Sequence, residues 1–549
     1  MLRLFLVLLL IPAFACGQRQ HPARPTDSGG PLMPEQAAYD VTFYDLDLDV
    51  RPETKSIAGT IEVHGRMLHP LEHFVLDLDT LLTASETWQV RNGERLPATF
   101  EQRGTKLWIS LDGTRQPGEP VQVGVQYEGV PRVAPNPPWV GGFTWSETED
   151  GSPWIATSVQ GDGADVWWPA KDHPSDEPDS MRMRYTVPAG LVAASNGRLL
   201  AQETLGDGRE AYTWFVSTPI NNYGVALNVA PYRVISDTYV STAGDSLEFS
   251  FYTLPESYEK AEVLFPELIE HLRWYEETIG PYPFRADKYG VVETPHLGME
   301  HQTITAYGNQ FREGQDGFDW LHHHELGHEW WGNLVTALDW RDFWIHEGFC
   351  AYMQPLYGEH LEGRGKYHEM IMRSRKGVLN VLPLAPRESM SENDMYLLPP
   401  DGLRSNSDIY AKGAWVLHTL RYLIGDEDFM VFLRRMAYPD PAMEAITDGR
   451  QVRFATSDDV VNVAEAVTGR DLEWFFEVYL RQPALPKLAQ ERIGDVLALR
   501  WDVPGDRPFP MPVDVVIDGA TQRVELPASL TVPAGAEVQV DPNVWILRD

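Results

Sequence analysis

Cysteine and positive charge are both scarce in this chain of 549 residues. Its two cysteines, Cys16 and Cys350, are too few for a disulfide framework. Lysine and arginine number 45 against 80 aspartates and glutamates, and the formal net charge of −35 repels phosphate backbones, so we expect no nucleic-acid partner. With 43% hydrophobic and 23% charged residues, the composition is that of a globular protein of several domains. It excludes collagen-like, coiled-coil and wholly disordered chains.

Residues 1–15 have the pattern of a signal peptide. An apolar run from Leu4 to Ile11, too short to span a bilayer, is followed by small residues up to Ala15. Cys16 comes next and resembles the lipidated cysteine of bacterial lipoproteins. We therefore expect an exported protein that a lipid on Cys16 anchors to the cell envelope, at the outer membrane or the periplasmic side. Residues 16–38 would then be the lipidated cysteine and a flexible tether.

Two alternatives remain for this segment. Ala13-Phe14-Ala15 also satisfies the ordinary signal-peptidase rule, which would make the protein periplasmic or secreted without an anchor. The apolar run could also be a buried strand.

Hydrophobic periodicity divides the rest of the chain into three domains. Residues 39–234 contain short runs at period two, such as Leu46, Leu48 and Val50, and predict an all-β domain. Residues 484–549 alternate again and are rich in proline and glycine, which predicts a small β-sandwich. The residues between them, 235–483, change to helical spacing. They predict a helix beginning near Ala261 and further helices at 317–331, 343–357, 410–423, 426–436, 457–466 and 472–480.

The strongest local signal is the segment His324-Glu325-Leu326-Gly327-His328. On a helix, residues four apart lie one turn apart on the same face, so the two imidazoles can bind one tetrahedral zinc ion with Glu325 beside the activated water. His322 and His323 point elsewhere on the helical wheel, and we expect them to be solvated or outside the ligand set. Taken alone, the motif is also compatible with a surface helix that exposes histidines.

A third ligand decides between these alternatives. Glu347 lies 19 residues after His328, on the next predicted helix, in the context Trp344-Ile345-His346-Glu347-Gly348-Phe349. A carboxylate there completes a set of two histidines and one glutamate and leaves one coordination position for water, as in catalytic zinc sites. We therefore predict one zinc ion per chain, bound by His324, His328 and Glu347.

Further motifs accompany the zinc motif. They are Gln160 nine residues before Pro169, Gly280-Pro281-Tyr282-Pro283-Phe284, Gly298-Met299-Glu300-His301 and Tyr410-Ala411-Lys412-Gly413. Together they resemble the membrane alanyl aminopeptidase family of zinc metallopeptidases, the gluzincins that include leukotriene hydrolase. The resemblance covers roughly residues 40 to 480. Leu297, His301 and His346 depart from the family pattern, which bears on subsite preference, but none of them replaces a zinc ligand or Glu325.

The resemblance implies a multidomain α+β fold and an aminopeptidase. The N-terminal β domain would be saddle-like, the catalytic domain thermolysin-like and mostly helical, and the long helical C-terminal domain of many members would be missing. Glu325 would act as general base, and Tyr410 would stabilise the oxyanion. Glu300 and Gln160 would bind the α-ammonium of a peptide with a free N-terminus. The edge strand at Gly298 and Met299 would pair with the peptide backbone.

Three other functions share part of this pattern. A zinc endopeptidase has the same metal motif but cleaves N-acetylated peptides as well. A lipid-epoxide hydrolase activity occurs in the family, although nothing here marks it specifically. The intact Glu325, Tyr410 and zinc ligands argue against a binding protein with an inactive enzyme fold. The sequence leaves the preferred N-terminal residue and the oligomeric state open.

The C-terminal segment bears on substrate length. Residues 484–549 contain few basic side chains that could bind the C-terminal carboxylate of a peptide. We therefore expect a cleft that is open at its far end, so that peptide length and a free carboxylate affect turnover only slightly.

Overall fold

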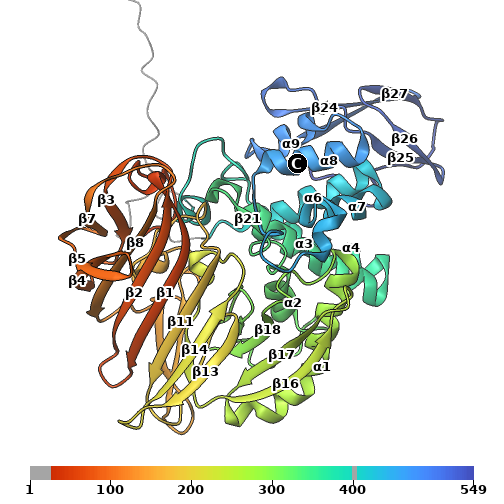
Figure 1. Cartoon of the computed structure of the whole chain (residues 1–549). Coiled ribbons are helices and arrows are strands. Elements are labelled where there is room, and N and C mark those ends of the chain that lie inside the picture. The colour runs from red at the N-terminus through yellow and green to blue at the C-terminus, as the bar shows by residue number, and fades with distance from the viewer. Residues whose placement is uncertain (1–25, 399–404) are drawn as a thin grey trace, which may run out of the picture.

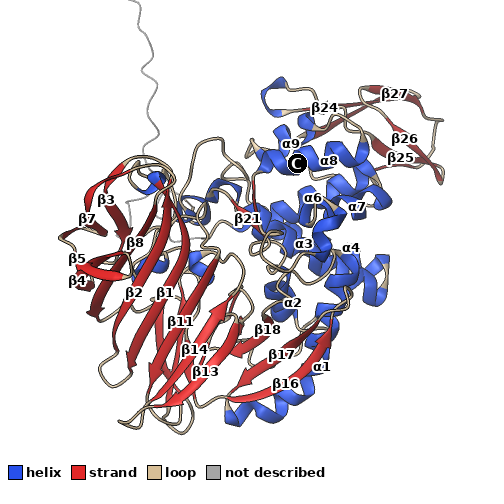
Figure 2. Cartoon of the chain, in the orientation of Figure 1, coloured by secondary structure: helices blue, strands red, loops and turns tan. Residues whose placement is uncertain are grey.

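The computed structural model describes residues 26–398 and 405–549. The predicted signal peptide and Cys16 lie outside the described residues. Figure 1 shows the chain passing from a strand-rich N-terminal part, through a helical part, to a small strand-rich part near its C-terminus. In Figure 2 most helices lie between these two β regions. This arrangement confirms the predicted multidomain α+β fold.

An eight-stranded sheet forms the body of the N-terminal domain. In β1 (Tyr39–Arg51), Leu46, Leu48 and Val50 are buried at period two, as the sequence pattern predicts. The sheet has the strand order β13-β14-β11-β1-β2-β8-β4-β5, and only β1 and β11 among these neighbours run parallel. The other strands are β2 (Ser56–Met67), β4 (Leu82–Arg91), β5 (Glu94–Pro97), β8 (Pro120–Gly129), β11 (Ser180–Val187), β13 (Arg198–Thr204) and β14 (Glu210–Val216).

Two smaller sheets complete this domain. One has the order β3-β7-β6 and the other the order β12-β15-β10-β9. The strand β10 ends at Ser158, two residues before Gln160, and so carries the chain to the edge of the domain at the predicted site. The strands are β3 (Leu71–Asp77), β6 (Phe100–Arg103), β7 (Lys106–Arg115), β9 (Gly142–Glu147), β10 (Pro153–Ser158), β12 (Val192–Ala194) and β15 (Asn228–Ala230).

A five-stranded sheet opens the catalytic domain, in the order β16-β17-β18-β20-β19. The short strand β19 (Gly298–Met299) lies at the edge and, within the described part of the chain, pairs with β20 alone. An edge strand can add an extended peptide through its free side, which is the role predicted for these two residues. The other elements are β16 (Arg233–Val240), β17 (Ser246–Thr253), β18 (Lys288–Glu293), β20 (Thr305–Tyr307) and the helix α1 (Tyr258–Thr278), which contacts β16 and β17.

The helices follow the predicted ranges with one shortening and two additions. The helix that carries the zinc motif, α2, contains only Trp320–Gly327, because the chain turns tightly afterwards and Asn333 N bonds back to His328 O. The additions are α4 (Arg364–Ser374) and the short α5 (Glu392–Tyr396), which the sequence did not predict. The remaining elements are α3 (Trp344–Glu362), α6 (Ala411–Ile424), α7 (Asp426–Ala437), α8 (Ser457–Thr468), α9 (Glu473–Leu480), β21 (Val335–Ala337) and β22 (Arg453–Ala455).

Two three-stranded sheets form the C-terminal domain, in the orders β23-β24-β27 and β26-β25-β28. Leu499, Val515 and Val532 belong to a small hydrophobic core that is separate from the main one. This is the small β domain that the alternation predicts. The strands are β23 (Lys487–Ile493), β24 (Val496–Asp502), β25 (Val513–Ile517), β26 (Ala520–Val524), β27 (Ala528–Thr531) and β28 (Val538–Val540).

The segment 26–38 packs against the protein and is not part of a flexible tether, contrary to our expectation. Ser28 N donates to Gly161 O at 3.2 Å, and Glu392 N donates to Ser28 O at 3.0 Å. Asn393 Nδ2 also donates to Asp27 Oδ1 at 3.0 Å. The segment has few apolar side chains, and hydrogen bonds of its backbone and polar side chains hold it against the protein instead. Within the described residues, no helix combines the length and apolar character needed to cross a bilayer.

Candidate active site

The two histidines of the zinc motif lie at the end of α2. Asp319 caps the start of this helix, since its carboxylate accepts a hydrogen bond from His322 N at 3.0 Å. His324 lies in the last turn, and His328 follows the helix with helical backbone angles, so both imidazoles project to one side. Their Nε2 atoms are 3.4 Å apart. His328 Nδ1 contacts Trp331 O at 2.9 Å, and a proton on Nδ1 leaves the Nε2 lone pair free for a metal.

Glu347, in the first turn of α3, completes the ligand triangle. Its Oε2 lies 3.3 Å from His324 Nε2 and 3.5 Å from His328 Nε2. A tetrahedral zinc ion with bonds of about 2.0 to 2.1 Å needs ligand atoms about 3.3 to 3.4 Å apart. Burial raises the pKa of Glu347, but the two histidines together lower it by more than burial raises it. The net shift is downward, so the carboxylate is ionised. The three predicted ligands therefore fit one zinc ion.

Two glycines allow α3 and α6 to pack closely, which places Tyr410 near the zinc ligands. A Cβ on Gly413 would lie 2.7 Å from the Cα of Gly348, so the helices touch backbone to backbone. Gly348 follows Glu347 directly, and Gly413 lies three residues after Tyr410. The Tyr410 ring is centred 6.1 Å from that of His324. Burial, and then the charge of Glu347, raises the pKa of Tyr410 well above its usual value, so its hydroxyl stays a hydrogen-bond donor.

Glu300 is a buried carboxylate directly after the edge strand β19. Its Oε1 accepts hydrogen bonds from Gln160 Nε2 at 2.5 Å and from the Tyr223 hydroxyl at 3.1 Å. Both donors belong to the N-terminal domain, so the two domains meet at this carboxylate. Burial raises the pKa of Glu300. Tyr223 carried no signal in the sequence, because it stands 77 residues before Glu300 and outside any motif.

Glu325 faces the edge strand. A Cβ on Gly298 would lie 2.4 Å from Glu325 Oε1, so a residue without a side chain is required for this approach. Burial raises the pKa of Glu325 well above its usual value; His328 opposes this rise and Glu300 adds to it. One carboxylate oxygen of Glu300, one of Glu325 and one ring nitrogen of His328 all lie within 4.8 Å of one another.

All of the predicted site residues line a single cavity of about 310 Å³ between the N-terminal and catalytic domains. The structure thus brings together the zinc ligands, Glu325, Tyr410, Glu300, Gln160, Gly298 and Met299. Sequence motifs did not single out the remaining lining residues, which include Pro138, Trp139, Trp320, Leu321, Glu392 and Tyr396. Among the described residues, four glutamates and no lysine or arginine line this cavity, so it suits a cationic group.

His322 and His323 are fully buried, which corrects the expectation that they might be solvated. His322 Nε2 lies 3.0 Å from the Tyr289 hydroxyl, and the ring of His323 stacks on Tyr357 with centroids 4.5 Å apart. The reason is that α2 contacts both α1 and α3, so the side of the helix away from the metal meets protein instead of solvent.

Of the three residues that depart from the family pattern, two lie outside the cavity wall and one lies in it. His346 Nε2 accepts a hydrogen bond from Ala337 N at 2.8 Å, and His301 is fully buried. Neither of them lines the cavity, whereas Leu297 does. These two histidines therefore depart from the family pattern without changing the cavity wall.

Comparisons with known proteins agree with this arrangement. The family model described as the peptidase M1 N-terminal domain matches residues 41–223, and the model described as the peptidase family M1 domain matches residues 269–479. The first match contains Gln160 and Tyr223, and the second contains the three zinc ligands, Glu325, Tyr410, Glu300, Gly298 and Met299. The chain belongs to peptidase family M1.

Solved structures and curated relatives extend the likeness within family M1. A variant of the M1 zinc metallopeptidase from Deinococcus radiodurans, bound to a Tyr-Ser-Ala substrate, is 25% identical, with a TM-score of 0.65. That match covers 82% of this chain and 95% of the other. Leucine aminopeptidase 2 from Neosartorya fischeri is 24% identical over 86% of this chain and 77% of its own length.

Other members of family M1 are much longer than the matched region. Aminopeptidase N from Lactococcus lactis subsp. lactis is 31% identical over 179 residues, which are 32% of this chain and 20% of that protein. The match to aminopeptidase N from Escherichia coli covers 52% of this chain and 33% of that protein. This chain therefore spans a fifth to a third of these two relatives.

Proposed function

We propose that this M1-family protein is a zinc-dependent aminopeptidase that hydrolyses the first peptide bond of peptides with a free N-terminus. The observation that carries the proposal is the closeness of Glu300 and Glu325, whose carboxylate oxygens lie within 4.8 Å. In a peptide the α-nitrogen and the first carbonyl carbon are about 2.5 Å apart. An ammonium bound to Glu300 therefore presents the first carbonyl, and no later one, to Glu325 and the metal ligands.

The residues around this carbonyl have complementary roles. When bound to His324, His328 and Glu347, zinc supplies an acidified water and polarises the scissile carbonyl. Glu325 takes the proton of the attacking water and transfers it to the leaving nitrogen. The Tyr410 hydroxyl donates a hydrogen bond to the oxyanion that develops in the transition state.

Residues beside the catalytic groups hold the substrate in place. Glu300 pairs with the α-ammonium, while Gln160 and Tyr223 fix the orientation of its carboxylate. The edge strand at Gly298 and Met299 pairs with the backbone of the substrate. An internal segment of a protein brings no charge to Glu300 and leaves this buried carboxylate unpaired, which disfavours an endopeptidase.

A panel of aminoacyl anilides, assayed with and without a chelator, tests the proposal. We expect turnover that the chelator abolishes and that added zinc restores. The matched substrates carry an N-acetyl group, and we expect them to be cleaved poorly. Efficient cleavage of the blocked substrates would favour an endopeptidase, and zinc binding without any turnover would favour a binding protein.

The proposal includes export and a lipid anchor, which rest on the sequence of residues 1–16 alone. Cys16→Ser removes the thiol that would carry the lipid and leaves the signal peptide intact. We expect the variant to move from the detergent-requiring membrane fraction to the soluble fraction. An unchanged distribution would support simple secretion.

A further inference from the structure

A second cavity adjoins the active-site cavity. It measures about 570 Å³ and shares Leu297 and Trp320 with the active-site cavity. Its other walls come from the loop between β20 and α2 and from side chains of α3 and α4, such as Gln354 and Arg373. No motif predicted this cavity, because its walls come from separate segments of the chain.

A bound peptide would extend from Glu300 toward this second cavity. With its ammonium at Glu300, the backbone passes Met299 and Gly298 antiparallel to β19 and next reaches Leu297. Substrate and strand both advance about 3.3 to 3.4 Å per residue, and Leu297 precedes Glu300 by three residues. The third or fourth residue of the substrate therefore arrives at the second cavity.

The two cavities differ in charge. Of the residues that the structure describes, four glutamates and no lysine or arginine line the first, whereas the second is lined by two arginines, Arg312 and Arg373, together with Glu313 and Asp316. Arg373 already forms an ion pair with Asp316, because its Nη2 lies 2.6 Å and 2.7 Å from the two carboxylate oxygens of Asp316. The guanidinium of Arg312 is exposed, and Nη2 donates one hydrogen bond to the neutral Gln310 Oε1 at 2.6 Å. Arg312 is therefore the cation that is available to a ligand.

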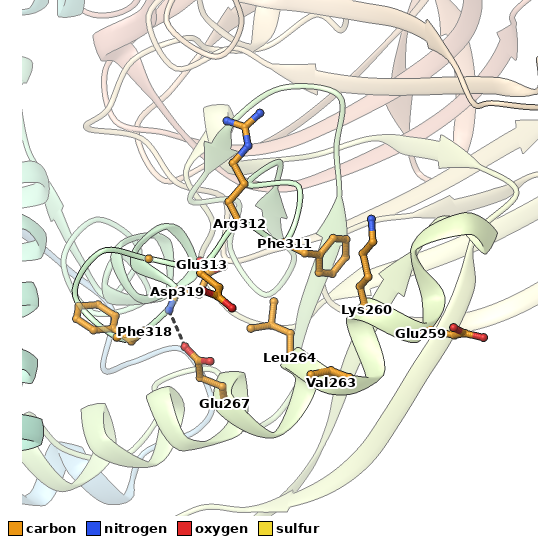
Figure 3. Close-up of a pocket in the computed structure, with 12 residues that line it drawn as sticks. Glu259, Lys260, Val263, Leu264, Glu267, Phe311, Arg312, Glu313, Phe318 and Asp319 are labelled. Carbon is orange, nitrogen blue, oxygen red and sulfur yellow. Dashed lines mark hydrogen bonds between the residues drawn. The ribbon is translucent and has the colours of Figure 1, made fainter.

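The local backbone holds Arg312 outward. Gln310 and Phe311 both have left-handed backbone angles, with φ of 57° and 56°, which side chains of this size rarely adopt. Asn309 Nδ2 donates to Arg312 O at 3.2 Å and closes this turn. Figure 3 shows the result: Arg312 points away from α1, whereas the neighbouring Glu313 points toward it. The Glu313 carboxylate therefore points away from the Arg312 guanidinium and does not pair with it.

We propose that Arg312 binds the C-terminal carboxylate of short peptide substrates, about three to five residues long, whose N-terminus lies at Glu300. The inference rests on the proposed aminopeptidase function and deepens it by naming the substrate class. It replaces the expectation that the far end of the cleft lacks a carboxylate-binding group. Glu300 and Arg312 together match the two terminal charges of a short peptide.

The experiment is a length series of peptides from two to eight residues with the same N-terminal residue, each with a free and an amidated C-terminus. For peptides of three to five residues we expect kcat/KM to be about fivefold higher with the free carboxylate, mainly through a lower KM. Arg312→Gln should reduce this ratio to about one. The matched control is Lys260→Gln, because Lys260 lies on α1 in a separate pocket that Arg312 also lines, but does not line the second cavity (Figure 3). This control should keep the ratio.

Equal cleavage of free and amidated peptides by the parent protein would overturn the inference, even without any variant. The inference would also fail if Arg312→Gln kept the full ratio or if Lys260→Gln removed it. Aminoacyl anilides, which have no C-terminal carboxylate, separate this failure from a failure of the proposed function. Cleavage of anilides by the parent protein supports the aminopeptidase proposal whatever the peptides show.

Discussion

The hydroxyl of Tyr223, in the N-terminal domain, donates a hydrogen bond to Oε1 of Glu300, in the catalytic domain, over 3.1 Å. Gln160 donates to the same oxygen. In the proposed function, the second carboxylate oxygen, which accepts a hydrogen bond from neither of these donors, binds the ammonium of the substrate. The position of this anchor depends on how the two domains pack against each other, so changes at the domain boundary should alter substrate binding.

Tyr223→Phe should raise KM for peptides and anilides about tenfold and change kcat less. A hydrogen bond to a charged group contributes about 1.5 to 3 kcal/mol, and here it orients a group that binds the substrate. Steady-state kinetics provide the measurement. Tyr232→Phe is the matched control, because the buried Tyr232 hydroxyl donates to Glu293 O and does not line the cavity. A similar rise in KM for both variants would indicate a general loss of stability.

Glu325→Gln should retain zinc and lose catalytic turnover by a factor of about a thousand or more. The amide has the same shape as the carboxylate but cannot accept the proton, and Glu325 is not among the three zinc ligands. Metal analysis of the purified variant and its kcat for an anilide are the two measurements. Loss of zinc together with activity would assign Glu325 a structural role.

Tyr410→Phe should lower kcat about a hundredfold and leave KM nearly unchanged. A donor that acts on the developing oxyanion contributes mainly in the transition state, and removal of the hydroxyl changes the packing volume very little. Tyr422→Phe is the control on α6, the helix that begins directly after Tyr410, since the Tyr422 hydroxyl donates to Asp514 of the C-terminal domain. A rise in KM at constant kcat would instead make Tyr410 a substrate-binding residue.

Deletion of residues 1–30 should destabilise the protein relative to deletion of residues 1–25. The segment 26–30 pairs with Gly161 and with the start of α5, and both of these line the active-site cavity. We expect the longer deletion to lower Tm by about 3 °C and to speed proteolysis near α5. Thermal unfolding and limited proteolysis of the two truncated proteins are the comparison. Equal Tm values would show that the segment contributes nothing to stability.

Much of the fold follows from local patterns. Alternation in β1 and helical spacing in α6 and α7 specify elements whose buried faces can be derived from a few consecutive residues. The length of α2 was overestimated, because the hydrophobic pattern continues into Trp330 and Trp331 although the backbone leaves the helix at Gly327. Periodicity reports which residues are buried, and it does not distinguish a helix from a tight turn inside a core.

By itself, the sequence predicted the zinc-binding set, and the structure brings its three members together. His324, Glu325 and His328 are within one turn of one another, and the short connection to Glu347 keeps the third ligand near, so spacing along the chain already sets their geometry. Only the tertiary structure decided which groups surround this set. Gln160 and Tyr223 meet Glu300 across 140 and 77 residues of sequence, and Arg312 lies beside the cavity through the fold of its loop. The reason is physical: a helical turn fixes neighbours through local hydrogen bonds, whereas contacts between distant segments depend on the packing of whole domains, which no single stretch of sequence contains.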